Sequence, residues 1–168
     1  TNRLGRYELP RSVFEHGACS PEEPPRPWRV VEAKLDGTSP GLQVIDADGQ
    51  RHLFKVDYRD QEERGTASDA IATRMLYAIG YNTPCNRVVV FDRDDLVLDP
   101  SIVDREDEDA PTPESIEAVL EQATPAPDGR LRGSLSEFIE GDLLGGWSYT
   151  GVREEDLNDV IDHRDRRE

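Results

Sequence analysis

The chain has 168 residues, a length that suits one domain or one domain with an appendage. Its net charge of −16 argues against nonspecific binding to nucleic acid or to an anionic membrane surface, because both partners select for basic patches. No apolar run reaches the length of a membrane span, and the first residues have no signal-peptide pattern.

The first 27 residues predict an irregular arm that lies across the domain, with only Val13 and Phe14 buried. Five prolines interrupt this segment, and its last part, PEEPPRP, is typical of an extended linker. The arm also carries Cys19. This cysteine could pair with Cys85 in an oxidising compartment, but two cysteines define no framework, and no Cys/His spacing indicates zinc.

Three strands are predicted next, over residues 28–35, 42–45 and 52–57. The turn clusters DGTSPG and DADG separate them, so the short connections favour an antiparallel three-stranded meander.

A helix is then predicted up to Gly80, with Thr66 as its N-cap, Asp69 three residues on and Gly80 as its C-terminal stop. Its alanine-rich side would pack closely against the sheet. The residues that recur at helical spacing are Ala67, Ala70, Ile71, Arg74, Met75, Ala78 and Ile79.

The second half predicts strands over 88–91 and 96–98, joined by the turn 92–95, and a strand over 131–139. Between them, Thr112 and Pro113 open a short helix whose apolar face is Ile116, Val119 and Leu120. The acidic run 104–113 lacks the ligand spacing of a calcium loop and is interpreted as a solvated loop. From Arg153 onward a helix is predicted, with Leu157, Val160 and Ile161 on one face.

Lys55 is the residue that most invites a chemical explanation. Of the 20 lysine and arginine residues, only Lys34 and Lys55 are lysines. Lys55 lies within a predicted apolar strand. A lysine ammonium is a compact point charge suited to a phosphate oxygen, whereas an arginine fork has a different geometry. An ordinary strand lysine with a hydrated head is the alternative.

Common catalytic motifs are absent from the sequence: it has no GxSxG, HExxH, CxxC, GxxxxGK[ST] or GxGxxG. The triplet His163-Arg164-Asp165 spells the start of a kinase catalytic loop, but the chain ends before the asparagine that such a loop needs. This segment is predicted to be helical, so a charged helix face is the interpretation.

The order of the elements resembles a nucleotide-binding lobe. A loop with Gly37 and Gly41 joins the first two strands and would cover phosphates, and the third strand carries Lys55. A helix preceded by an acid follows, and a later strand ends in SEFIEG, where a hinge over an adenine would begin.

Several segments of the chain carry a resemblance to a family. They are TNRLGRYEL at the start, KLDGTSPGLQVIDADG, LFKVD, TASDAIATRMLYAIGYNTP and PDGRLRGSLSEFIEGDLLG. Over essentially its whole length the chain resembles uncharacterised, exported bacterial proteins with a kinase-like (HipA-like) core. The resemblance implies an α+β fold, a kinase-like N-terminal lobe with a mainly antiparallel sheet of five to six strands, one main packing helix and additional short helices.

The resemblance also implies an organisation: an arm over 1–27, the nucleotide-type lobe over 28–146, and the start of a helical region over 147–168. We expect this sequence to be part of a longer, extracytoplasmic polypeptide, with the catalytic-loop and metal-binding residues beyond Glu168.

The same resemblance assigns roles to individual residues. Lys55 would contact the phosphates of ATP bound with Mg²⁺, and Glu63, with Asp69 as the second choice, would hold the lysine. Gly37 and Gly41 would lie at the phosphates, and Glu137 and Ile139 would belong to the hinge, Ser136 to Gly141.

Two hypotheses remain open. The chain is either part of an exported kinase-like phosphotransferase with Lys55 at the ATP phosphates, or a non-catalytic, kinase-like accessory subunit of a larger protein assembly. Nucleotide binding by the protein, with Lys55→Ala as the control, distinguishes them.

Overall fold

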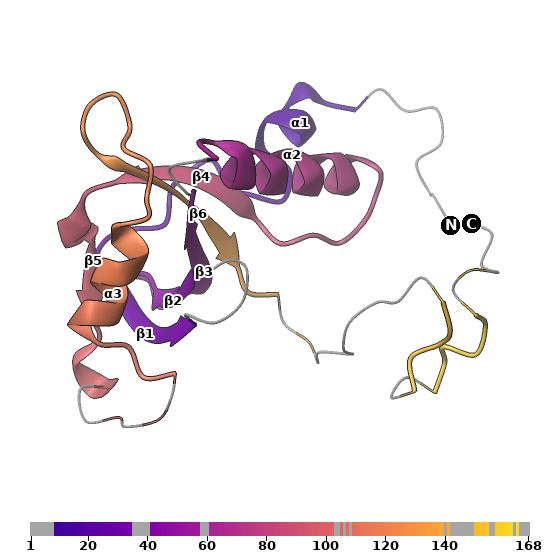
Figure 1. The fold of residues 1–168 in the computed structure, drawn as a ribbon. Helices are drawn as coiled ribbons and strands as arrows, with labels where there is room; N and C mark the ends of the chain where they lie inside the picture. The colour runs from indigo at the N-terminus through magenta and orange to yellow at the C-terminus, as the bar shows by residue number, and fades with distance from the viewer. Residues whose placement is uncertain are drawn as a thin grey trace.

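The fold is described from a computed structural model, which describes residues 9–34, 41–57, 61–102, 105, 107, 109–139, 141, 150–154, 157–162 and 164. In this part of the chain six strands form one sheet, and three helices lie around it (Figure 1). The elements in chain order are α1 (Arg11–His16), β1 (Trp28–Lys34), β2 (Gly41–Ile45), β3 (Arg51–Val56), α2 (Arg64–Ala78), β4 (Asn86–Phe91), β5 (Leu96–Leu98), α3 (Pro113–Leu120) and β6 (Leu131–Glu137). Single 3₁₀ turns, η1 (Arg93–Asp95) and η2 (Pro100–Ile102), flank β5. The predicted α+β class with a mainly antiparallel sheet is therefore confirmed.

The sheet has the strand order β4-β6-β3-β2-β1-β5. Strands β1, β2 and β3 form the predicted antiparallel meander, and β6 pairs with both β3 and β4. Among the strands that the structure describes, only β1 and β5 pair in parallel. The turn 92–95 joins β4 to β5 without pairing them, since they are the two edge strands. A connection this short between opposite edges requires the sheet to curl around its core.

The concave side of the sheet holds the hydrophobic core. Trp28, Phe54 and Phe91 are fully buried there, with ring centroids 5.0 to 6.2 Å apart. Helix α3 covers them with the three apolar residues predicted from its spacing, Ile116, Val119 and Leu120. The predicted start of α3 is also confirmed, because the Thr112 hydroxyl accepts the Ser115 N–H at 3.1 Å.

Helix α2 begins three residues earlier than its sequence predicts, with Glu63 rather than Thr66 at the N-cap position. Thr66 is not its N-cap: it lies within the first turn, where its N–H donates to the Asp57 carboxylate at 2.9 Å. The carboxylate of Asp57, which directly follows β3, therefore caps the start of α2 in place of the predicted Thr66 side chain. The predicted stop at Gly80 is confirmed, because this residue has φ +93° and its N–H donates to the Tyr77 carbonyl, while the Tyr81 N–H donates to Leu76.

The N-terminal arm is more ordered than predicted. It contains α1, which packs against α2, and Phe14 is about half exposed rather than buried. A disulfide between Cys19 and Cys85 ties the arm to the segment before β4, with a Cα–Cα distance of 4.6 Å. Beside it, Arg87 donates to the Ser20 carbonyl at 3.0 Å.

The helix predicted from Arg153 is not observed in the described part of this region, which forms turns and bends. The residues expected on its apolar face, Leu157, Val160 and Ile161, are all exposed. Asp159 accepts the Arg153 N–H at 2.7 Å, so a side-chain contact closes a turn here in place of helical hydrogen bonds. None of the described helices is long and apolar enough to cross a membrane.

Candidate functional site

Lys55 lies in the middle of the sheet, with β2 on one side of its strand and β6 on the other. It pairs with Gly41 and with Ser134, while Leu53, two residues earlier, pairs with Gln43 and Ser136. Residues directly opposite in neighbouring strands share a face, and so do residues two apart. These six residues therefore form one surface, which we name the Lys55 face. Lys55, Leu53, Gln43 and Ser136 are half-buried there.

Gly41 packs closely beside Lys55 and has no room for a side chain of its own. A Cβ atom at Gly41 would lie 2.9 Å from the Phe54 carbonyl oxygen and 3.4 Å from the Lys55 Cγ. The predicted phosphate loop thus ends in a residue that fits only without a side chain. Gly37 and the rest of that loop lie outside the described residues.

The predicted hinge begins at the other end of β3. Glu137 is the last residue of β6 and pairs with His52, and the Phe138 N–H donates to the Arg51 carbonyl. Three residues of strand, about 10 Å, separate this position from Lys55. Ile139 lies beyond the strand, about half exposed, so β6 ends two residues before the predicted end.

Asp57 joins β3 to α2 beside the Lys55 face. Its spacing of two from Lys55 places both side chains on the same side of an extended chain. The buried Asp57 carboxylate accepts the Thr66 N–H and the Thr66 hydroxyl, and it lies 3.6 Å from the Arg132 Nε. The charge of Asp57 is therefore compensated by an arginine and two helix donors.

Glu63 lies at the start of α2, as the sequence predicts, but its contact is with another residue. Its carboxylate lies 3.4 Å from the Arg132 guanidinium, and its φ is +61°. Among the described residues no ion pair joins Lys55 to Glu63 or to Asp69. The structure thus brings Glu63 together with Asp57 and Arg132 and does not bring it to the lysine.

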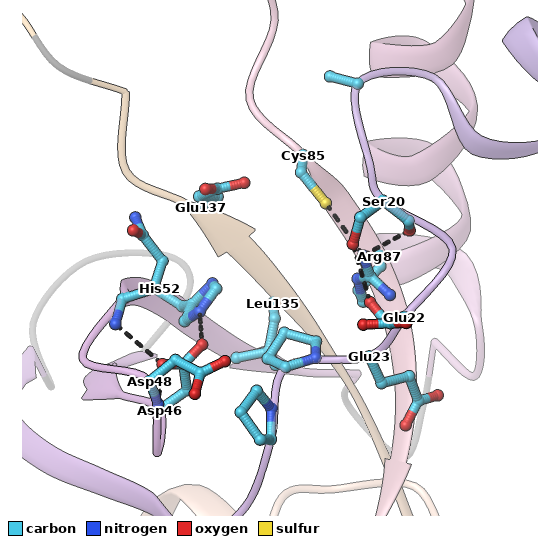
Figure 2. Close-up of a pocket in the computed structure, with 14 residues that line it drawn as sticks. Ser20, Glu22, Glu23, Asp46, Asp48, His52, Cys85, Arg87, Leu135 and Glu137 are labelled. Atoms are coloured by element: carbon cyan, nitrogen blue, oxygen red, sulfur yellow. Dashed lines mark hydrogen bonds and ion pairs between the residues drawn. The ribbon is translucent and has the colours of Figure 1, made fainter.

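A separate groove of about 500 Å³ lies between the N-terminal arm, the β2–β3 turn and the ends of β3, β4 and β6 (Figure 2). At its floor His52 and Asp46 are both buried, with 2.9 Å between Nε2 and Oδ2. Asp46 also accepts the N–H groups of Asp48 and Gln50 at 3.0 and 2.8 Å. The His52–Asp46 contact therefore holds the β2–β3 turn closed.

Glu137 belongs to this groove by its side chain. It is opposite His52 in the sheet and so shares the core face rather than the Lys55 face. Burial lowers the pKa of the nearby Arg87 guanidinium, while the carboxylates of Glu23 and Glu137 act in the opposite direction. Of the predicted hinge residues, Glu137 could therefore take part in the Lys55 site through its backbone only.

Sequence reasoning missed Arg132 and the His52–Asp46 pair. Arg132 contacts residues far away in the chain, so no local spacing indicates its role. His52 and Asp46, in contrast, are only six residues apart on either side of the predicted turn 46–49, and that spacing could have indicated the pair. The described residues contain no group of three or more His, Cys, Asp or Glu side chains that could hold a metal ion. His163 and Asp165 of the triplet noted above lie outside the described residues.

Comparison of the chain with family models, with curated proteins and with solved structures gives no match in any of the three.

Proposed function

We propose that this chain is the nucleotide-binding lobe of a kinase-like (HipA-like) phosphotransferase, in which Lys55 contacts the phosphates of ATP bound with Mg²⁺. The observation that carries the proposal is the position of Lys55. It lies on the third strand, between the strand that follows the glycine loop and the strand that leads to the hinge. A lysine in this position is how protein kinases hold their nucleotide phosphates.

Two further observations support this proposal. A Cβ atom at Gly41 would meet the Phe54 carbonyl oxygen and the Lys55 Cγ, so the position beside the lysine requires a glycine, as the end of a glycine loop would. Helix α2 is anchored to Asp57, two residues after Lys55, so the helix and the lysine keep a fixed relation. Because Glu63 contacts Arg132, we propose that the pairing of the lysine with an acid requires bound nucleotide or a side-chain rearrangement.

The test is nucleotide binding by the protein, measured by thermal shift and by calorimetry with ATP and Mg²⁺. A ligand at about 100 times its Kd stabilises the folded state by about 2.7 kcal/mol, which a thermal shift detects readily. We expect Lys55→Ala to weaken binding by about 10- to 100-fold, because a charge-assisted hydrogen bond contributes about 1.5 to 3 kcal/mol.

Arg51→Ala is the matched control, since it removes a cation from the exposed end of the same strand. It should leave the affinity for ATP nearly unchanged. No thermal shift with Mg²⁺ and ATP, or a shift that Lys55→Ala leaves intact, would refute nucleotide binding at this face.

An extracytoplasmic location is part of the proposal. The Cys19–Cys85 disulfide supports it, because disulfides persist mainly in oxidising compartments. Intact-mass analysis of protein isolated from its native compartment without reductant tests this: a mass equal to that of the fully reduced chain would contradict it.

The second candidate is a non-catalytic accessory module of a larger assembly. A specific observation favours it: α2 exposes several large apolar side chains on the side that faces away from the sheet. A protein that binds no nucleotide but associates through this helix would fit the second candidate and not the first.

A further inference from the structure

Helix α2 is apolar on two sides. The side toward the sheet buries small residues, Thr66, Ala70 and Ala78. The outward side carries a stripe that we define as Ile71, Ala72, Met75, Leu76 and Ile79. Their spacing of i, i+1, i+4, i+5 and i+8 places them on one face of a helix.

The outward stripe is open to solvent. Met75 is 63% exposed, Ile71 57% and Ile79 48%, and Tyr81 adds an exposed ring just beyond the end of the helix. Contiguous apolar surface of this kind on a folded protein is typical of an interaction site. Helix α1 lies beside α2 (Figure 1). It contacts α2 near Arg74, where Gly17 packs, while the side chains of the stripe are exposed.

The charge of this segment differs from that of the chain. Between Gly65 and Cys85 the only charged residues are Asp69 and Arg74, which cancel, although 33% of the whole sequence is charged. Depletion of charge together with exposed Met and Tyr is the composition of an interface centre. A cationic partner would need acidic groups to pair with, and α2 offers only Asp69.

We propose that the stripe is the contact between two copies of this chain, related by a two-fold axis that pairs α2 with its equivalent. An apolar and nearly uncharged surface is complementary to another such surface. In a two-fold dimer both copies use the same surface, so the stripe needs only to be complementary to itself. Ala72 within the stripe lets the two helices approach to the usual 8–10 Å.

The available area agrees with this assignment. A side chain of this size that is half exposed offers on the order of 100 Å². Ile71, Met75, Leu76, Ile79 and Tyr81 together therefore provide on the order of 500 Å² per copy, the larger part of the 800 Å² or so per partner in a standard interface. This inference does not depend on nucleotide binding at Lys55.

The net negative charge of each copy allows the proposal to be tested by varying the salt concentration. Each copy carries a net charge of −16, so two copies repel each other while the stripe attracts. Raising NaCl from about 0.1 M to about 1 M shortens the Debye length from about 10 Å to about 3 Å and removes most of this repulsion. The dimer should therefore become tighter with salt, whereas an ionic interface would become weaker.

The experiment is sedimentation equilibrium, with light scattering after size exclusion, on the complete chain over a range of concentrations. We expect a concentration-dependent rise from the monomer mass of 18.9 kDa toward twice that value. Met75→Ser and, separately, Ile71→Ser should raise the dissociation constant at least tenfold. Both side chains are mostly exposed, so circular dichroism should show an unchanged fold.

Leu157→Ser is the matched control, because Leu157 is 91% exposed and lies outside the stripe. It should leave the dissociation constant unchanged. A chain that stays monomeric at all concentrations and salt levels overturns the proposal. So does a dimer that Met75→Ser and Ile71→Ser leave intact, or one that NaCl dissociates.

Discussion

The two faces of the sheet are built from alternate residues of the same strand, but they are held in different ways. On the core face, Phe54 packs against the rings of Trp28 and Phe91, and no polar contact is needed. On the Lys55 face, Leu53 and Lys55 are half-buried, and polar contacts around Asp57 hold α2 in place. The comparison shows how one strand of six residues can pack one face into the core and keep the side chains of the other face half-buried.

Substitution of adjacent residues on β3 should separate the two faces most strongly. Phe54→Ala removes a fully buried ring and should lower the free energy of unfolding by about 3 to 5 kcal/mol. Leu53→Ala, one residue earlier on the half-buried face, should cost only about 1 kcal/mol. Urea unfolding followed by circular dichroism measures both. Equal losses would mean that the two faces are packed alike.

Beside the Lys55 face, Asp57 is the residue whose polar contacts we expect to contribute most to the stability of the fold. Asp57→Ala removes the buried partner of Arg132 and the carboxylate that accepts the N–H of the first turn of α2, and we expect a loss of about 3 kcal/mol. Glu63→Ala is the control, because this exposed carboxylate contacts the same arginine and should contribute at most about 1 kcal/mol. If chemical denaturation gives the two variants the same stability, the contact of Asp57 with α2 is not what anchors the helix.

Elements with a strong local pattern were predictable from the sequence. The meander followed from alternating residues and short turns, and α3 followed from Thr112, Pro113 and the spacing of its apolar residues. The stop of α2 at Gly80 followed from the need for positive φ there. In each case the residues that determine the structure are close together in the chain.

The parts that the sequence did not predict depend on contacts between distant residues. The start of α2 is set by Asp57, nine positions before Thr66, and this outcompetes the local cap. The position of β6 between β3 and β4 follows from pairing between residues 40 or more positions apart, which no short window of sequence reveals. The same dependence on distant residues applies to the candidate site. Lys55 was identified because lysine is rare in this chain, whereas the contact of Glu63 with Arg132 was not predicted.

Gly41 tests whether the Lys55 face tolerates any added volume. In Gly41→Ala the new Cβ would meet the backbone oxygen of Phe54 at 2.9 Å, and a backbone atom cannot turn aside as a side chain can. We expect a loss of about 1 to 3 kcal/mol, the usual cost of overpacking, measured by thermal unfolding. Gln43→Ala, two residues along the same face, removes atoms instead and should cost less. A fully stable Gly41→Ala protein would show that β2 and β3 can separate here.

The smallest effect is expected at Asp99, which invites comparison with Asp57 because each buried acid directly follows a strand. Hydrogen bonds from the Ser101 hydroxyl at 2.6 Å and the Ser101 N–H at 2.8 Å lower the pKa of the Asp99 carboxyl, burial acts in the opposite direction, and Arg29 adds a smaller lowering. Near neutral pH, Asp99→Asn should therefore reduce the free energy of unfolding by less than about 1 kcal/mol.

The sign of the pH dependence distinguishes this electrostatic effect from a packing defect. Because the folded-state pKa of Asp99 is below the unfolded value of about 3.9, its contribution is fully present above that value and is lost as the pH falls through the folded-state pKa. Melting temperatures of the native protein and of Asp99→Asn should differ at pH 7 and converge in acid. Ser101→Ala removes the strongest cause of the lowered pKa of Asp99. In a Ser101→Ala protein, the melting temperatures with and without the Asp99→Asn substitution should therefore change less relative to each other between pH 7 and acid. A difference that stays constant from neutral to acidic pH would mean that Asp99 acts through its shape rather than its charge.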